Sequence, residues 1–355
     1  MNSTTAPPRQ EWQFGRIYPP DEAWLASAAP EPIIDPDLPI VDPHHHLWLR
    51  GGHRYLLDEL LADLGNGHNV VATVFLECHS MYRADGPAEM RPVGETEFVA
   101  GIAAMSASGN YGKTRVAAGI VGHADLTLGD RVEPVLLAHI RAGGGRFRGV
   151  RHSAGHDPDP VIGNSGTGIE PHLYQRADFR AGLKRLSALG LSFDAWLYHP
   201  QLADVVDLAR AFPATPIVMG HVGGFLGYGA YAGRRDEEFA KWKGSMTELS
   251  RCPNVVVKLG GMVNRGAAYD FHRAATAPSS ETMAELWRPF VETCIELFGA
   301  DRCMFESNFP VDKMAVGYAA LWNAFKRIAS GASRDEKRAL FAGTAARTYR
   351  IGGVG

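Results

Sequence analysis

Eight short apolar runs, separated by longer amphipathic stretches, restrict the fold of this chain more than any other feature. The runs are, in order, PIVDPHH, NVVATVFLEC, TRVAAGIVGH, FRGVRHS, LSFDAWLYH, TPIVMGHV, NVVVKLGG and RCMFESNF. Most of them are apolar at successive positions, which is typical of parallel strands covered by helices on one face and by a core on the other. The stretches between them repeat apolar residues at three- and four-residue spacing, as amphipathic helices do, at residues 130–143, 201–212, 237–251 and 280–299. The sequence therefore predicts a succession of βα units.

Eight βα units favour an α/β fold of the closed (β/α)8 type, the TIM barrel, and leave a doubly wound open sheet as the alternative. A chain of 355 residues with 45% hydrophobic residues is long and apolar enough for one such domain. We expect residues 39–355 to form the barrel. Residues 1–38 are rich in proline, alanine and acidic residues, so we expect an extended N-terminal arm that wraps the barrel or a partner subunit.

Charge and cysteine content exclude several classes of protein. The formal net charge of −3 lacks the basic excess of nucleic-acid-binding domains. No apolar stretch reaches the roughly 18 residues that cross a bilayer, and the first residues lack the basic and apolar segments of a leader. The four cysteines form no C-x-x-C pair. We therefore expect a cytoplasmic protein that binds a small molecule and neither nucleic acid nor a membrane, with the arm and the loop after His221 as candidates for a homodimer interface.

Histidines gather at the ends of the apolar runs. In VDPHHHLW, the two-residue period of a strand directs His44 and His46 to one face and His45 to the other. His199 closes the fifth run and His221 the sixth. Because active sites of such barrels lie at the carboxyl ends of the strands, we expect four imidazoles at one mouth of the barrel. Neutral imidazole is a good ligand for a divalent metal, so a functional cluster is predicted there.

Four segments, VDPHHHLW, FRGVRH, GHVGG and CMFESNFPVDK, resemble the amidohydrolase superfamily, and within it the branch that contains sugar-lactone and aromatic-catabolic lactonases. The resemblance covers about residues 39–350. It implies that residues at several strand ends, two of them at the end of the first strand, converge on a metal or on the scissile group. By motif match, these residues are His44, His46, His199, His221 and Asn308. Asn308 stands where the family has an aspartate that serves as general base or metal ligand, so the resemblance leaves both a metal-dependent and a metal-independent mechanism open.

Carboxylates near the run ends are candidates for the missing base. Glu77 ends the second run and is the preferred candidate, because partial burial raises the pKa of a carboxyl toward neutrality. A salt bridge between Glu77 and a barrel arginine is the alternative. Glu306 shares a strand face with Asn308 by parity and is the second candidate. A carboxylate inside a barrel needs a partner, and Lys258 is the expected one.

Three further residues are predicted to contact substrate. Arg151 lies near the end of the fourth run, and its planar guanidinium suits bidentate binding of a carboxylate. The resemblance supports this role, since members of the lactonase branch act on carboxylate-bearing substrates. Lys258 is a second candidate, because the alternative to a structural ion pair is contact with substrate. Tyr82 is an aromatic residue that could line the pocket.

These observations predict an amidohydrolase-type hydrolase that opens a small carboxylate-bearing lactone, or a related ester-like or amide-like bond, by attack of water on a carbonyl. With a metal, for which zinc is the expected ion, His44, His46 and His199 would be the ligands, and His221 would polarise the carbonyl. Without a metal, the imidazoles would hold the carbonyl oxygen directly. The Asn308 amide would orient water or donate to the oxyanion.

Two other functions remain open at this stage. One is a metal-dependent non-oxidative decarboxylase of a small aromatic or muconate-type acid, against which the absence of the strand-eight aspartate counts. The other is a ligand-binding barrel without catalysis, against which the retained histidines count.

Overall fold

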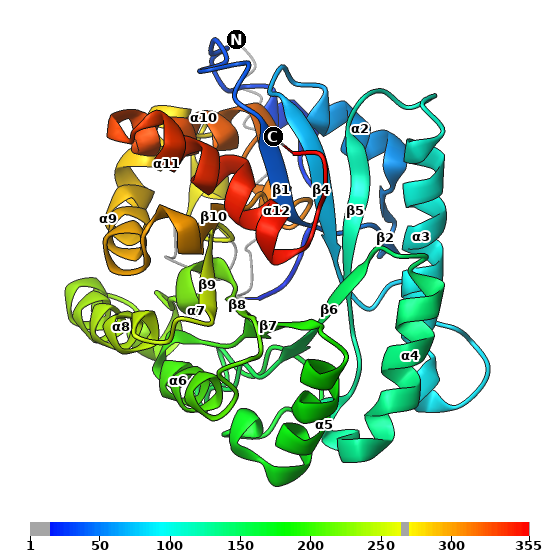
Figure 1. Cartoon of the computed structure of the whole chain (residues 1–355). Coiled ribbons are helices and arrows are strands. Elements are labelled where there is room, and N and C mark those ends of the chain that lie inside the picture. Colours follow the sequence, from blue (N-terminus) through cyan, green and yellow to red (C-terminus); the bar gives the residue numbers. More distant parts are fainter. Residues whose placement is uncertain (1–14, 264–269, 355) are drawn as a thin grey trace.

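The predicted TIM barrel is confirmed by the computed structural model, which describes residues 15–263 and 270–354 (Figure 1). Eight parallel strands form one sheet whose spatial order follows the chain. They are β1 (Ile40–His45), β4 (Val70–Leu76), β5 (Arg115–Gly122), β6 (Phe147–Ser153), β7 (Ser192–Trp196), β8 (Ile217–Met219), β9 (Val255–Leu259) and β10 (Cys303–Phe305). Each of the eight apolar runs contains one of these strands. A doubly wound open sheet would have a different strand order, so that alternative is excluded.

Closure of the barrel occurs just beyond the end of β10. The Asn308 backbone N–H donates to the His44 carbonyl at 2.9 Å, and the His46 N–H donates to the Phe309 carbonyl at 2.7 Å. The Asp42 carboxylate accepts from the Ser307 N–H at 3.0 Å. These contacts place the H-x-H segment of the first strand directly beside the segment that carries Glu306 and Asn308.

Helices surround the barrel in the order that the sequence predicts (Figure 1). The longer ones are α2 (Leu57–Leu64), α3 (Val93–Ala107), α4 (Glu133–Ala142), α5 (Ala177–Ala188), α6 (Leu202–Ala211), α8 (Arg235–Ser250), α9 (Ser280–Phe298) and α10 (Tyr318–Ile328). The shorter ones are α7 (His221–Gly224), α11 (Arg334–Arg338) and α12 (Thr344–Thr348). A hairpin of β2 (Trp48–Arg50) and β3 (His53–Tyr55) follows β1 and was not predicted, because strands of three residues are too short to show a period.

Both faces of the strands are buried, as the continuous apolar runs predict. Phe75, Ile120 and Phe193 are fully buried in the layer between strands and helices. A second cluster fills the barrel interior and is made of Val41, Ala72, Val74, Leu76, Val121, Val218, Met304 and residues near the C-terminus. Among the latter is Tyr349, which has no exposed surface and donates its hydroxyl to Asp194 at 2.6 Å. The end of the chain therefore contributes to the barrel core.

The N-terminal arm is only partly extended. Residues 1–14 lie outside the described part of the chain, and the rest of the arm contains a short helix, α1 (Glu22–Leu25), which was not predicted. Asp21 caps this helix, since its carboxylate accepts from the Trp24 N–H at 3.0 Å. Trp24 is 4% exposed and donates its indole N–H to the Ala274 carbonyl at 3.1 Å. The arm therefore packs on the barrel of its own chain. None of the helices in residues 15–263 and 270–354 is long and apolar enough to cross a membrane.

Candidate active site

A cavity of about 160 Å³ opens at the carboxyl ends of the strands, where barrels of this type carry their active sites. Its walls come from the N-terminal arm, from the segments that follow most of the strands, and from the β2 hairpin. The lining residues are Ile17, His46, Trp48, Arg50, Glu77, Cys78, His79, Arg151, Ser153, Ser165, Trp196, His221, Gly261, Asn308 and Val311. Five of the sequence-predicted site residues lie among them: His46, Glu77, Arg151, His221 and Asn308.

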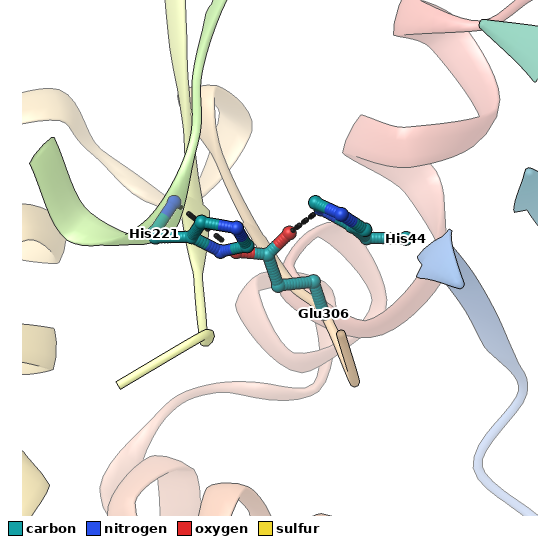
Figure 2. A group of neighbouring side chains, drawn as sticks. All are labelled: His44, His221 and Glu306. Carbon is teal, nitrogen blue, oxygen red and sulfur yellow. Dashed lines mark hydrogen bonds and ion pairs between the residues drawn. The ribbon is translucent and has the colours of Figure 1, made fainter. Parts of the chain in front are cut away.

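The Glu306 carboxylate lies between the rings of His44 and His221 (Figure 2), and of these three residues His221 lines the cavity. Its Oε2 accepts from His44 Nδ1 at 2.5 Å, and its Oε1 accepts from His221 Nδ1 at 2.7 Å and from the His221 backbone N–H at 3.2 Å. The two imidazoles stack with centroids 4.7 Å apart. Burial would raise the pKa of the fully buried Glu306 carboxyl, but the interactions with His221 and His44 outweigh it and hold that pKa well below its usual range. Glu306 is therefore an ionised carboxylate.

Local backbone geometry makes room for this arrangement. His221 follows β8 with a φ of +52°, in the left-handed region, and so turns its ring back over the end of the strand. Gly261, with a φ of +62°, faces the same ring, and a Cβ there would lie 1.9 Å from His221 Nδ1. A Cβ on Gly260 would lie 2.5 Å from Glu306 Cγ. The two glycines that end the run NVVVKLGG therefore provide the space in which Glu306 meets His221.

The H-x-H histidines present two lone pairs to each other. His46 Nδ1 lies 2.9 Å from the Leu76 carbonyl, which can only accept, so the proton of His46 is on Nδ1. His44 Nδ1 donates to Glu306 in the same way. Burial lowers the pKa of both imidazoles well below the usual range, so both are neutral and each Nε2 is an acceptor. These two acceptor atoms face each other at 3.2 Å, a separation at which a cation is the natural partner of both.

The donor set therefore fits a divalent metal. Ligand atoms of His44, His221 and Glu306 also lie within 4.8 Å of one another. Since both Glu306 oxygens accept from imidazole N–H groups, we assign Glu306 to orienting the histidines, as carboxylates commonly do behind metal-bound imidazole. The Nε2 atoms of His44 and His46 are then the ligand positions, and Arg151 Nη1 lies 3.5 Å from His44 Nε2.

His45 points away from the cavity. Its Nε2 lies 2.9 Å from the Thr73 hydroxyl, and burial lowers its pKa to about 3. The two-residue period of the strand thus separates His45 from its neighbours, as the sequence predicts.

Glu77 forms the arginine salt bridge that the sequence left as the alternative to a base. Its Oε1 accepts from Arg151 Nε at 2.7 Å, and its backbone carbonyl accepts from Arg151 Nη2 at 2.6 Å. Burial would raise the pKa of Glu77, but the Arg151 charge outweighs it, with help from His79 and His123, and lowers that pKa to about 2. A carboxylate held in this way is a weak base near neutral pH, so the preferred assignment of Glu77 as base is not supported by its contacts. Arg151 uses its Nε–H and one Nη2 N–H on Glu77, so the edge formed by these two groups is not available for the predicted bidentate grip on a substrate carboxylate. Nη1 is the guanidinium nitrogen that Glu77 does not contact.

Asn308 lines the cavity with its amide oriented by a neighbour. Its Nδ2 donates to Asp312 Oδ1 at 2.9 Å, so its Oδ1 is the atom left for water or substrate. Its φ of +55° is in the left-handed region, which asparagine tolerates better than most residues. Burial raises the pKa of the Asp312 carboxyl well above its usual range.

His199 does not join the cluster, so its prediction as a metal ligand is not supported by the geometry. Its Nε2 lies 3.2 Å from the buried Glu238 carboxylate, and its Nδ1 accepts from the Leu226 N–H at 3.2 Å. Both ring nitrogens therefore have partners that hold the segment after α7. The physical reason is the strand length: β7 ends at Trp196, and His199 starts a 3-10 turn beyond it.

Lys258 and Tyr82 also lie outside the cavity lining. Lys258 is fully buried and pairs with Asp194 at 3.0 Å, not with Glu306 as predicted, so it serves the barrel interior. The Tyr82 hydroxyl lies 3.3 Å from His79 Nδ1. His79 itself lines the cavity and was missed, although it follows the end of β4 by three residues. Ser165 and Ile17 were missed because they belong to a long loop and to the arm, where no periodic pattern marks a direction.

The chain matches the amidohydrolase family over residues 41–351. It is 34% identical over 337 residues to the uncharacterised protein y4mH of Sinorhizobium fredii. The alignment covers 89% of this chain and 99% of that protein. It is 28% identical over 320 residues to an L-fucono-1,5-lactonase of Burkholderia multivorans. That alignment covers 88% of this chain and 96% of the lactonase. A solved amidohydrolase of Burkholderia multivorans with bound zinc has a TM-score of 0.66 at 25% identity, over 88% of this chain and 99% of that one. The chain therefore belongs to the amidohydrolase family, and it is a hydrolase enzyme with the barrel fold of that family.

Proposed function

We propose that this protein hydrolyses a small lactone, with His221 as the residue that transfers the proton and Glu306 as the carboxylate that orients it. The observation that carries the proposal is the buried Glu306 carboxylate, which accepts from both His44 and the cavity-lining His221. The name of the Burkholderia multivorans relative, an L-fucono-1,5-lactonase, supports a lactone as substrate class. The cavity of about 160 Å³ is smaller than the roughly 300–1,000 Å³ of pockets for drug-sized ligands, which supports a single small ring.

The path of the proton follows from the tautomer of His221. Because its Nδ1–H donates to Glu306, its Nε2 lone pair is left to accept a proton from water. As the water oxygen bonds to the lactone carbonyl carbon, this proton passes to Nε2, and ionised Glu306 stabilises the imidazolium that forms. The proton then moves to the ring oxygen as the acyl–oxygen bond breaks. The product is a hydroxy acid, and His221 returns to its neutral form.

Two other residues assist at the reacting carbonyl. Arg151 Nη1 is the donor of that guanidinium not used by Glu77, and it supplies an N–H to the oxyanion. Asn308 Oδ1 accepts from the attacking water and orients it, since the amide N–H2 is held by Asp312. A divalent metal would be bound by the Nε2 atoms of His44 and His46 and would polarise the carbonyl. Zinc is the first candidate, because a solved relative contains it.

The test is hydrolysis of a panel of 1,4- and 1,5-lactones of sugar acids. A pH indicator monitors the acid that hydrolysis releases. His221→Asn is expected to lower kcat at least about 100-fold, the lower range for loss of a general acid–base group. The matched control is His172→Asn, because His172 is a surface histidine whose side chain is 69% exposed and pairs with Asp204. That variant should keep the wild-type kcat.

Two results would contradict the proposal. One is wild-type kcat in His221→Asn, which would remove His221 from the proton path. The other is release of carbon dioxide from aromatic or muconate-type acids without turnover of any lactone, which would support the decarboxylase alternative.

A further inference from the structure

The cavity lining includes an apolar part that the proposed chemistry does not use. Trp48 of the β2 hairpin and Val311 of the loop after β10 are 1% and 8% exposed, and both line the cavity. The Trp48 ring stacks on His46, with centroids 5.8 Å apart. Ile17, which is partly buried against the main core, completes this part of the lining. Ile17 belongs to the N-terminal arm, outside the βα units of the barrel.

Contacts on the C-terminal side of Ile17 hold this part of the arm at the cavity. The Tyr18 N–H donates to Met314 Sδ at 3.0 Å, immediately after Ile17. Glu22 pairs with Lys313 at 3.1 Å. Met314 and Lys313 belong to the same loop that carries Asn308 and Val311, so the arm is attached to a segment that already forms the site. Trp24 attaches the arm to the segment before α9 through its bond to the Ala274 carbonyl.

From this placement we propose that Ile17 is a specificity-determining residue, and that it selects lactones with an alkyl substituent on the ring. The substituent packs against Ile17, Trp48 and Val311, while the carbonyl lies at the polar residues His221, Arg151 and Asn308. The inference depends on the proposed lactone hydrolysis. The arm, which is not part of the barrel, thereby determines which substrate the barrel site accepts.

The substitution that tests this is Ile17→Ala, which removes three carbons from the apolar lining without adding a polar group. The probes are δ-valerolactone and its derivatives with a methyl, ethyl or propyl group on the carbon next to the ring oxygen. For the substituted lactones, kcat/KM is expected to fall about tenfold or more, the low end of what one lost methylene contact costs in an apolar pocket. For unsubstituted δ-valerolactone, kcat/KM should change less than about twofold, because that ring does not reach Ile17.

Ile33→Ala is the matched control. Ile33 is another partly buried isoleucine of the arm, but it lies beside Gly67, in the segment before β4 and so at the opposite end of the strands from the cavity. Its substitution should leave the substituent dependence at the wild-type pattern. Thermal unfolding of both variants shows whether the arm remains folded. Ile17→Phe should shift the preference toward shorter substituents, since a larger side chain fills part of the same space.

A parallel fluorescence titration separates failure of this inference from failure of the proposed function, because Trp48 and Trp196 line the cavity and report binding. Turnover by the wild type with an equal change for all four lactones in Ile17→Ala would overturn the role of Ile17 and leave lactone hydrolysis in place. Binding that depends on the substituent and on Ile17, without turnover, would support Ile17 and contradict the hydrolysis. Absence of both binding and turnover for the whole series would overturn the inference, while the sugar-acid lactone panel would still test the function.

Discussion

Replacement of Glu306 by glutamine is the most informative single change in this site. The carboxylate accepts from two imidazole N–H groups, one on each oxygen. Glutamine keeps the shape but has one oxygen and one N–H2 group, so it can accept from only one of the two histidines. The N–H2 group then faces the Nδ1–H of the other histidine, which must move its proton to Nε2. Either His44 loses its free lone pair, or His221 loses the atom that takes the proton from water.

The magnitude of the effect follows from both roles. In the Ser-His-Asp triad, the equivalent carboxylate-to-amide change leaves geometry intact but puts histidine in the wrong tautomer and lowers kcat about 10⁴-fold. We expect Glu306→Gln to lower kcat between about 10³- and 10⁴-fold. One buried imidazole N–H also loses its acceptor, which should lower the free energy of unfolding by about 1–3 kcal/mol. Lactone hydrolysis and urea denaturation measure the two effects.

Glu238→Gln is a matched control for this experiment. Glu238 is 2% exposed and contacts His199 at 3.2 Å, so it is also a buried glutamate on an imidazole, but it lies outside the cavity lining. Its substitution should lower the free energy of unfolding and leave kcat near the wild-type value. A Glu306→Gln variant that keeps more than about a tenth of the wild-type kcat would refute the reasoning, because the triad precedent allows no such retention. Equal losses of kcat in both variants would show that the effect is general destabilisation.

Three further predictions concern other parts of the site. The low pKa of Glu77 contributes stability that is present above its unfolded pKa and is lost as the pH falls through its folded pKa. In Glu77→Gln, the fall in the free energy of unfolding between about pH 4.5 and about pH 2 should therefore be smaller than in the wild type by about 3 kcal/mol. Denaturation at several pH values measures this difference. Asn308→Asp places a second carboxyl group at the 2.9 Å contact with Asp312, so one of the two carboxyl groups must stay protonated. The Tm should therefore fall by several degrees in a thermal scan. An unchanged Tm would mean that the contact is unimportant. His199→Asn should lower the Tm but leave the metal content per chain, measured by elemental analysis, the same as in the wild type; a lower metal content would restore His199 as a candidate ligand.

The sequence predicts the fold well because the apolar runs report burial on both faces of each strand. That pattern depends only on side-chain type and survives the wide variation in strand length, from three residues in β8 and β10 to eight in β5. The two-residue period holds through the end of β1 and for one residue beyond it. His44 and His46 therefore meet, while His45 turns to Thr73.

Parity loses its meaning where a strand ends, and this accounts for the errors in the site. The run LSFDAWLYH continues three residues past β7, so His199 lies in a turn with its own direction. Partners cannot be assigned from one strand at a time either. Lys258 had two carboxylates within the barrel from which to choose, and it pairs with Asp194 because His44 and His221 occupy both oxygens of Glu306. Such pairings depend on contacts between strands that are far apart in sequence.

The hydroxyl of Tyr349 has a consequence for how this protein is made. It reaches Asp194, the partner of Lys258, from a position 155 residues further along the chain. During synthesis from the N-terminus, residues 194 and 258 leave the ribosome long before residue 349 does. For that interval the ion pair lacks the hydrogen bond that the tyrosine later donates. The barrel interior can therefore reach its final packing only after residue 349 has left the ribosome.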